Sequence, residues 1–146
     1  MESTNYKWLR IKNGKPYFAI IDLSIEKNNM QNVIIENYCG IGYSNHSIDV
    51  GANDSESWKI GLRKGLDFVL SQDKNFWKIN INGIQGKPIT DTNPTIVGFA
   101  TILAFCEATK IAIDKNHLEK IENFVFSSWE KDNAEKIPNF EKLSFE

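Results

Sequence analysis

The side chains that could support nucleophilic catalysis are few and lie mostly in one polar stretch. His46 is followed within that stretch by Ser55 and Ser57 and preceded by Cys39. A serine or cysteine nucleophile needs an adjacent base that is itself held in place by a third group. No G-x-S-x-G turn surrounds either serine. We therefore interpret these residues as loop positions whose polar groups bond to water or to the backbone.

Metal chemistry has even weaker support. His46 and Asp49 are three residues apart, but no third ligand lies at a useful spacing, and zinc sites use three or four protein ligands. His117 stands at the start of an expected helix, which favours a capping or surface role. The sequence thus predicts no catalytic residue, no metal and no cofactor. An enzyme that uses Asp91, His46 or Cys39 is the least favoured alternative.

Cysteine usage and the first residues favour a cytoplasmic protein. Cys39 and Cys106 occur without a CxxC pattern, so we expect two reduced thiols that pack as small hydrophobic side chains. Residues 1–7 lack the basic and apolar regions of a secretory signal. The longest apolar run, residues 96–106, is 11 residues long, well short of the ~20 needed to span a bilayer. We expect no membrane partner.

Composition points to one folded domain over residues 1–146. The chain has 41% hydrophobic residues and a net charge of −2, which excludes collagen-like, coiled-coil and disordered classes. A chain of this size buries about 68–70% of its unfolded surface, enough for a real core. The slightly negative charge argues against a general nucleic-acid binder.

Charge is unevenly distributed along the chain. Residues 1–21 sum to +3, residues 22–56 to −5, and residues 114–146 to −3. One interpretation is that these are ordinary solvated faces. The sharper hypothesis is that Asp49, Asp54 and Glu56 meet a basic protein partner, because complementary charge speeds and orients association.

Strand patterns fill the first third of the chain. Residues 6–12 alternate in hydrophobicity and precede Asn13-Gly14, and residues 16–25 alternate again, which predicts a hairpin. Residues 32–38 form a further β-branched run, so we expect a three-stranded meander. Residues 44–57 are polar without an apolar period, which is typical of a loop.

Helix patterns dominate the remainder. Trp58, Leu62, Leu66 and Val69 recur at helical spacing, and residues 76–81 predict a fourth strand. Asn93 before a proline predicts the start of a deeply buried helix over about residues 94–112. A more polar third helix is expected over residues 118–129. In the alternative interpretation, residues 123–126 form a strand. The tail after residue 137 either docks on the body or stays mobile.

The order of these elements and several motifs resemble domain IV of elongation factor G, a domain of the ribosomal protein S5 domain 2-like class. The match covers about residues 15–112. It rests on Lys64-Gly65 in the first helix, on a strand that ends in Asn82-Gly83, on Asp91-Thr92-Asn93 where the family has Asp-Ser-Ser, and on small residues in the helix that follows. The resemblance implies an α+β fold, a split β-α-β arrangement in which a four-stranded, mostly antiparallel sheet carries two helices on one face. The C-terminal helix and tail, residues 113–146, lie outside it.

The resemblance extends less well to function. In the family, the tip loops of this domain enter the decoding site of the ribosome. Here the first tip loop keeps only Gly14, and Pro88 lies near the position expected to hold histidine. The phosphate loop G-x-x-x-x-G-K-[ST] of a GTPase is also missing from the sequence, so the chain is not a translocase.

Two hypotheses for function follow. The first is a non-catalytic cytoplasmic binding protein, an acidic inhibitor or immunity-type protein for a toxin or nuclease, that uses Asp49, Asp54 and Glu56. The alternative is a ribosome- or RNA-associated protein that uses a tip formed by Lys12, Lys15 and Lys87. In this alternative the alternating basic and aromatic residues 7–12 contact RNA, whereas a hairpin also alternates when Trp8 simply packs in the core.

Overall fold

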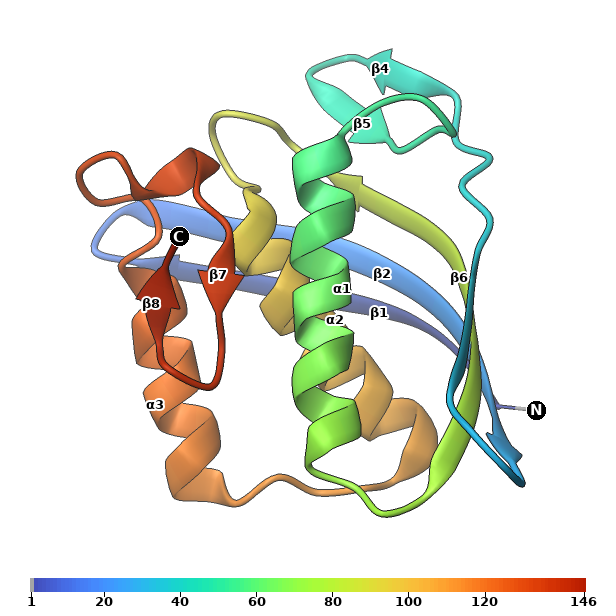
Figure 1. Cartoon of the computed structure of the whole chain (residues 1–146). Coiled ribbons are helices and arrows are strands. Elements are labelled where there is room, and N and C mark those ends of the chain that lie inside the picture. The colour runs from blue at the N-terminus through green and yellow to red at the C-terminus, as the bar shows by residue number, and fades with distance from the viewer. Residues whose placement is uncertain (1) are drawn as a thin grey trace.

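The computed structural model describes residues 2–146 and has helices packed against a twisted sheet (Figure 1). Its helices are α1 (Glu56–Ser71), α2 (Pro94–Thr109) and α3 (Lys115–Phe126), followed by a short 3-10 turn at Asn133–Glu135. The strands of the main sheet are β1 (Glu2–Lys12), β2 (Lys15–Asn28), β3 (Val33–Glu36), β4 (Gly42–Ser44), β5 (Ser47–Asp49) and β6 (Phe76–Gly86). The fold class is therefore α+β, as expected.

Within residues 2–146 the main sheet has six strands, not the four expected from the sequence. Its order is β1-β2-β6-β5-β4, and β3 pairs with the other part of β6. All pairings are antiparallel except that of β3 with β6. The predicted hairpin of β1 and β2 is confirmed, and Asn13 and Gly14 form its turn with φ angles of 52° and 77°.

The predicted meander is wrong at its third strand. β3 does not lie beside β2; it pairs in parallel with β6, with Val33 opposite Lys78. Parallel neighbours need a crossover connection, and the segment that contains α1 supplies it. Hydrophobic alternation identified residues 33–36 as a strand, but alternation carries no information about the neighbouring strand.

The polar stretch expected as a loop contains a second hairpin. β4 and β5 pair from Gly42–Asp49 to Ser44–Ser47, around a turn in which Asn45 and His46 have φ angles of 52° and 65°. Two consecutive residues with positive φ are the signature of a type I′ hairpin turn. The strands are three residues long, too short to show a period in the sequence.

Helices α1 and α2 cross in close contact on one face of the sheet. A Cβ atom on Gly65 would lie 2.3 Å from the Gly98 carbonyl oxygen, and one on Gly61 would lie 2.2 Å from the Pro94 carbonyl oxygen. The backbones therefore touch where only glycine fits. Helix α2 begins as predicted, since Asn93 accepts a hydrogen bond from the Ile96 N–H at 2.9 Å.

The C-terminal third is built into the same body. α3 begins three residues earlier than expected, because Asp114 caps it by accepting from the His117 N–H. The tail docks through β7 (Pro138–Asn139) and β8 (Ser144–Phe145). Phe140 is 2% exposed and packs against Phe124 and the α2 backbone at Gly98.

None of the helices in residues 2–146 combines the length and the hydrophobicity that crossing a membrane would require.

Candidate functional site

Helices cover only one face of the main sheet, and the opposite face, here called the open face, remains exposed (Figure 1). Along β2 the residues alternate between buried positions under the helices and partly exposed positions on the open face; the latter include Phe18, Ile20 and Asp22. In β1 the open-face positions include Leu9 and Ile11, which are 46% and 75% exposed. Neighbouring exposed apolar side chains that form one patch rimmed by polar residues are typical of a surface that binds another protein.

A polar hollow of about 190 Å³ lies on this open face. It forms where a bulge in the β2–β6 pairing follows Asp22, and β-bulges re-aim the side chains around them. Asp22 from β2 and Asp49 from β5 both line it, together with neutral polar groups from β1 and β6: Asn5, Asn82 and Gln85. Within residues 2–146, neither carboxylate takes part in an ion pair.

The three acidic residues predicted to bind a partner have different roles. Asp49 lines the hollow. Asp54 accepts a hydrogen bond from the Gly51 N–H at 2.8 Å, which closes the turn before α1. Glu56, the first residue of α1, lies 3.3 Å from the ammonium of Lys59. Two of the three carboxylates thus already hold the protein's own groups.

The ion pair between Glu56 and Lys59 stabilises a buried ammonium. Lys59 is 2% exposed, and its ammonium donates to the Ala52 carbonyl at 2.9 Å and lies 4.7 Å from the centre of the Tyr38 ring. A buried ammonium needs such partners, because leaving one unpaired in a low-dielectric interior is costly. Glu56 therefore contributes to this local arrangement as well as to the surface charge.

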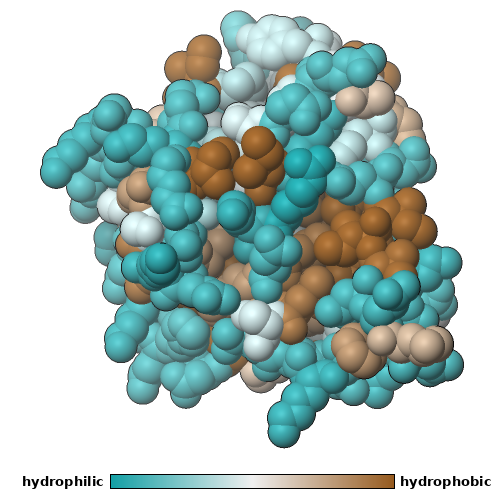
Figure 2. Space-filling view, in the orientation of Figure 1, coloured by the Kyte–Doolittle hydropathy of each residue, from teal (hydrophilic) through white to brown (hydrophobic). Residues whose placement is uncertain are grey.

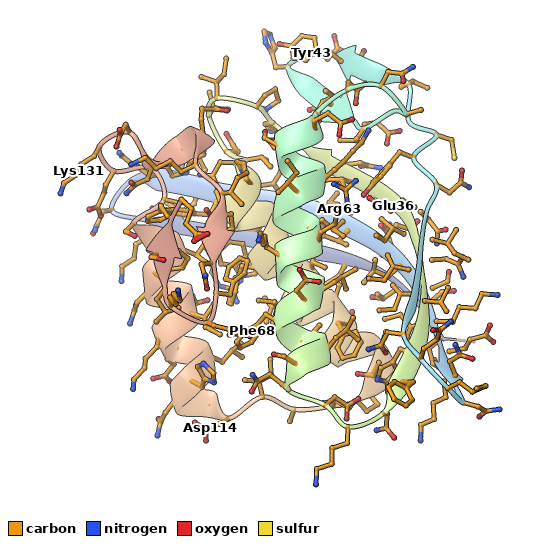
Figure 3. The ribbon with its side chains drawn as sticks, in the orientation of Figure 1. Glu36, Tyr43, Arg63, Phe68, Asp114 and Lys131 are labelled. Atoms are coloured by element: carbon orange, nitrogen blue, oxygen red, sulfur yellow. The ribbon has the colours of Figure 1, made fainter. Side chains whose placement is uncertain are left out.

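A second charged pair ties β3 to α1. Glu36 and Arg63 face each other in Figure 3, with 3.0 Å between an oxygen of the carboxylate and Nη2 of the guanidinium. Tyr38 donates to the same carboxylate at 2.8 Å. Partial burial acts to raise the pKa of Glu36, but the hydrogen bonds from Arg63 and Tyr38 outweigh it and leave that pKa below its ordinary value. Burial, and then the Glu36 carboxylate, raise the pKa of Tyr38 far above its usual range.

The helix-bearing side also carries hydrophobic surface. Figure 2 shows a hydrophobic area beside α1 in the direction of β3, and Ile34 of β3 is 38% exposed. The charged groups next to this area, Glu36 and Arg63, already neutralise each other. The open face differs because its carboxylates at Asp22 and Asp49 lack such cations among the described residues.

The predicted basic tip is assembled, but its lysines point to two sides. The hairpin turn and the loop before α2 lie together, because the Phe18 N–H donates to the Asp91 carbonyl at 2.9 Å. Lys12 and Lys15 line a hollow of about 320 Å³ at the end of α3. Lys87 lies on the open face, with its ammonium 5.9 Å from the centre of the Phe18 ring. Trp8, which was a candidate for stacking on RNA bases, is 1% exposed and belongs to the core.

The residues considered for catalysis are dispersed. His46 is exposed in the β4–β5 turn. His117 packs its ring edge-on against the Phe68 ring, with 5.4 Å between the ring centres. Ser55 is the residue before α1 and Ser57 lies in its first turn. Asp91 contributes its backbone to the tip.

The interpretation of both cysteines as packing residues is wrong for one of them. Cys39 is an exposed thiol, and Cys106 is half-buried. Burial raises the pKa of the Cys106 thiol to about 11. Cys39 instead lines the hollow on the open face.

Asp22, Asn82 and Gln85 were not predicted from the sequence as site residues. A signal was present, because the predicted outer side of residues 16–25 combines Phe18 and Ile20 with Asp22. A solvated strand face is normally polar throughout. Bulky apolar residues beside a carboxylate on that face therefore indicate a surface for binding.

No model of a known protein family matches this chain, and no curated protein matches it either.

Proposed function

We propose that this chain is a non-catalytic cytoplasmic binding protein that recognises a basic surface on another protein, as an inhibitor or immunity-type protein for a toxin or nuclease does. The observation that carries the proposal is the hollow on the open face, where Asp22 and Asp49 lie without cations among the described residues. A lysine or arginine from a partner would supply the missing charge.

The surroundings of the hollow also favour a protein partner. Exposed Leu9 and Ile11 and half-buried Ile20 extend the same face with apolar surface. Protein interfaces combine an apolar centre with charges that fix orientation and speed encounter. Asp49 is thus the one residue of the predicted acidic set that we retain as a direct contact, and Asp22 joins it.

A site-specific crosslink tests which face binds. Gln85 is exposed and lines the hollow, whereas Glu119 is exposed on α3. We expect p-benzoylphenylalanine at position 85 to crosslink one protein in the native cell and the same group at position 119 to leave that protein unmodified. Crosslinking of the partner from position 119 alone would contradict the proposal.

RNA is the second candidate partner, supported by the tip. Lys12, Lys15 and Lys87 are all exposed, and Lys12 lies 5.4 Å from the centre of the Phe126 ring. Lysines beside aromatic rings are typical of surfaces that bind single-stranded RNA. The likeness to domain IV of elongation factor G, including its S5 domain 2-like topology, stays part of this proposal.

Salt dependence distinguishes this candidate. If the tip binds RNA, the logarithm of the affinity falls linearly with the logarithm of the salt concentration. Each phosphate contact to single-stranded RNA makes this slope steeper by roughly 0.7. The variant K12A/K15A/K87A would then lower the slope by about 2, while K110A/K115A/K120A, which removes three exposed lysines elsewhere, would not. Equal slopes in the two variants would exclude the tip.

A further inference from the structure

The outer edge of β1 is a long strand edge that carries a protecting charge at Lys7 but lacks most of the usual protection. β1 is the terminal strand of the main sheet. It pairs with β2 without interruption from Glu2–Ile25 to Lys12–Lys15, and it contains neither a bulge nor a proline. Natural edge strands are commonly short, bulged, covered or interrupted by proline, because a free edge pairs with other strands.

The alternation of backbone hydrogen bonds identifies which groups face outward. The Phe18 N–H points away from β1, since it donates to the Asp91 carbonyl. Leu9 is the partner of Phe18 in the register, so Leu9 belongs to a pair that exchanges no hydrogen bonds, and its own N–H and C=O face the free edge. In agreement with this outward direction, the Leu9 carbonyl accepts a hydrogen bond from the Arg10 guanidinium at 2.8 Å.

The same alternation places Ser3, Asn5, Lys7 and Ile11 with Leu9. Within residues 2–146, these five residues make no backbone hydrogen bond outside their own strand pair. An edge with five outward N–H groups matches the length of an added strand. The side chains of these residues lie on the open face.

Charge and hydrophobicity restrict the occupant. Lys7 is the charged side chain of this outward-facing set, whereas Arg10, on the other side of β1, already lies 3.9 Å from Glu122. In the full-length antiparallel pairing of β1 with a second copy, Lys7 would lie opposite Lys7, and like charges placed directly opposite are destabilising. Leu9 and Ile11 favour apolar partners on the same face. The edge therefore fits an extended segment that places, on one face and two positions apart, apolar residues opposite Ile11 and Leu9 and an acidic residue opposite Lys7.

We propose that β1 accepts such an acidic, extended segment of a partner protein as a seventh strand of the main sheet. The site goes beyond the proposed function, because it depends on the backbone of β1 and on Lys7, and not on the carboxylates of the hollow. It also gives a role to the positive charge of the first hairpin.

The test uses a synthetic 11-residue threonine peptide with valine at positions 2 and 4 and glutamate at position 6, which face Ile11, Leu9 and Lys7 in antiparallel pairing, added to the full chain. The expected result is at least tenfold slower hydrogen exchange at the outward amides of Asn5, Lys7 and Leu9, with no change at Trp8 and Arg10. The same peptide with alternate backbone N-methyl groups should bind at least tenfold more weakly.

Two variants provide independent checks. Leu9→Pro removes an outward N–H that β2 does not use, and proline is tolerated at such edge positions; it should abolish the protection. Lys7→Glu leaves the backbone intact and should exchange preference for the glutamate peptide for the same peptide with lysine at position 6. D22N/D49N should bind the glutamate peptide as the native chain does.

Three results would overturn the proposal: no binding at millimolar peptide, binding that perturbs other elements and leaves β1 unchanged, or protection of β1 amides that grows with protein concentration without peptide. The last would mean that a second copy occupies the edge.

Discussion

Cys39 and Cys106 show how surroundings separate two identical side chains. Cys39 is exposed, and its thiol lies 3.7 Å from the Asn37 carbonyl. Cys106 is half-buried in α2, with its pKa raised to about 11. Only a thiolate reacts quickly with alkylating reagents. The two thiols should therefore differ in rate.

We expect iodoacetamide at pH 8 to modify Cys39 at least tenfold faster than Cys106, because burial raises the pKa of the Cys106 thiol and restricts access to it. Peptide mass spectrometry of time points gives both rates in one sample, and Cys39→Ser is the control that isolates Cys106. Equal rates in the folded protein would contradict the burial of Cys106.

Glu36 gives stability a defined pH dependence. Its pKa in the folded protein lies below the ordinary value of 4.5. A carboxyl with a lowered pKa stabilises the fold at neutral pH, and this contribution is lost as the pH falls through the lowered value. Glu36→Gln should accordingly reduce the free energy of unfolding at pH 7, and this difference should shrink as the pH falls below 4.5.

Urea unfolding of both proteins at several pH values measures this. Glu135→Gln, at an exposed position in the 3-10 turn, is the matched control and should show no such pH-dependent difference. A constant difference for Glu36→Gln across the pH range would exclude the ion pair as its cause.

The elements differ in how far their own sequence determines them. The apolar period of α1, the Asn93 cap of α2 and the Asn13-Gly14 turn are local signals, so they were predictable. The position of β3 was not, because pairing with β6 depends on residues about 45 positions away. The hollow likewise depends on the order of strands in the sheet, because residues from β2, β5 and β6, which are far apart in the sequence, line it together.

The α1–α2 crossing depends on glycine. Gly65→Ala would place a methyl group 2.3 Å from the Gly98 carbonyl, so the helices must separate. We expect a loss of about 1–3 kcal/mol of stability, typical of overpacking. Thermal or urea unfolding measures it, and Gly83→Ala, whose added Cβ meets only a side-chain atom at 3.9 Å, is the control. Equal loss in both variants would contradict the close crossing.

The docked tail should contribute to the common core. Phe140→Ala removes a side chain that is 2% exposed, and such truncations cost about 3–5 kcal/mol. Unfolding monitored by tryptophan fluorescence should remain a single transition with a lower midpoint. An unchanged midpoint would show that the tail does not stabilise the body.

At the scale of the whole molecule, the helices bury one face of the sheet and leave the other exposed. The open face, its hollow and the β1 edge adjoin one another, since Asn5 belongs to β1 and lines the hollow. The sequence indicated acidic and basic segments, but the fold decides which charges are available: Asp54 and Glu56 contact a backbone amide and an ammonium of the protein itself, whereas Asp22, which accepts from the Asn82 amide at 3.4 Å, and Asp49 line the hollow.

The most direct measurement compares affinity capture by the native chain, by D22N/D49N and by E119Q/E135Q, which removes the same charge at exposed positions elsewhere. If the hollow recognises the partner, the native chain and E119Q/E135Q will retain one protein in equal molar amount and free of RNA, and D22N/D49N will retain at least tenfold less. Equal capture by all three proteins, or capture of RNA that is lost as salt rises, would contradict recognition through the hollow.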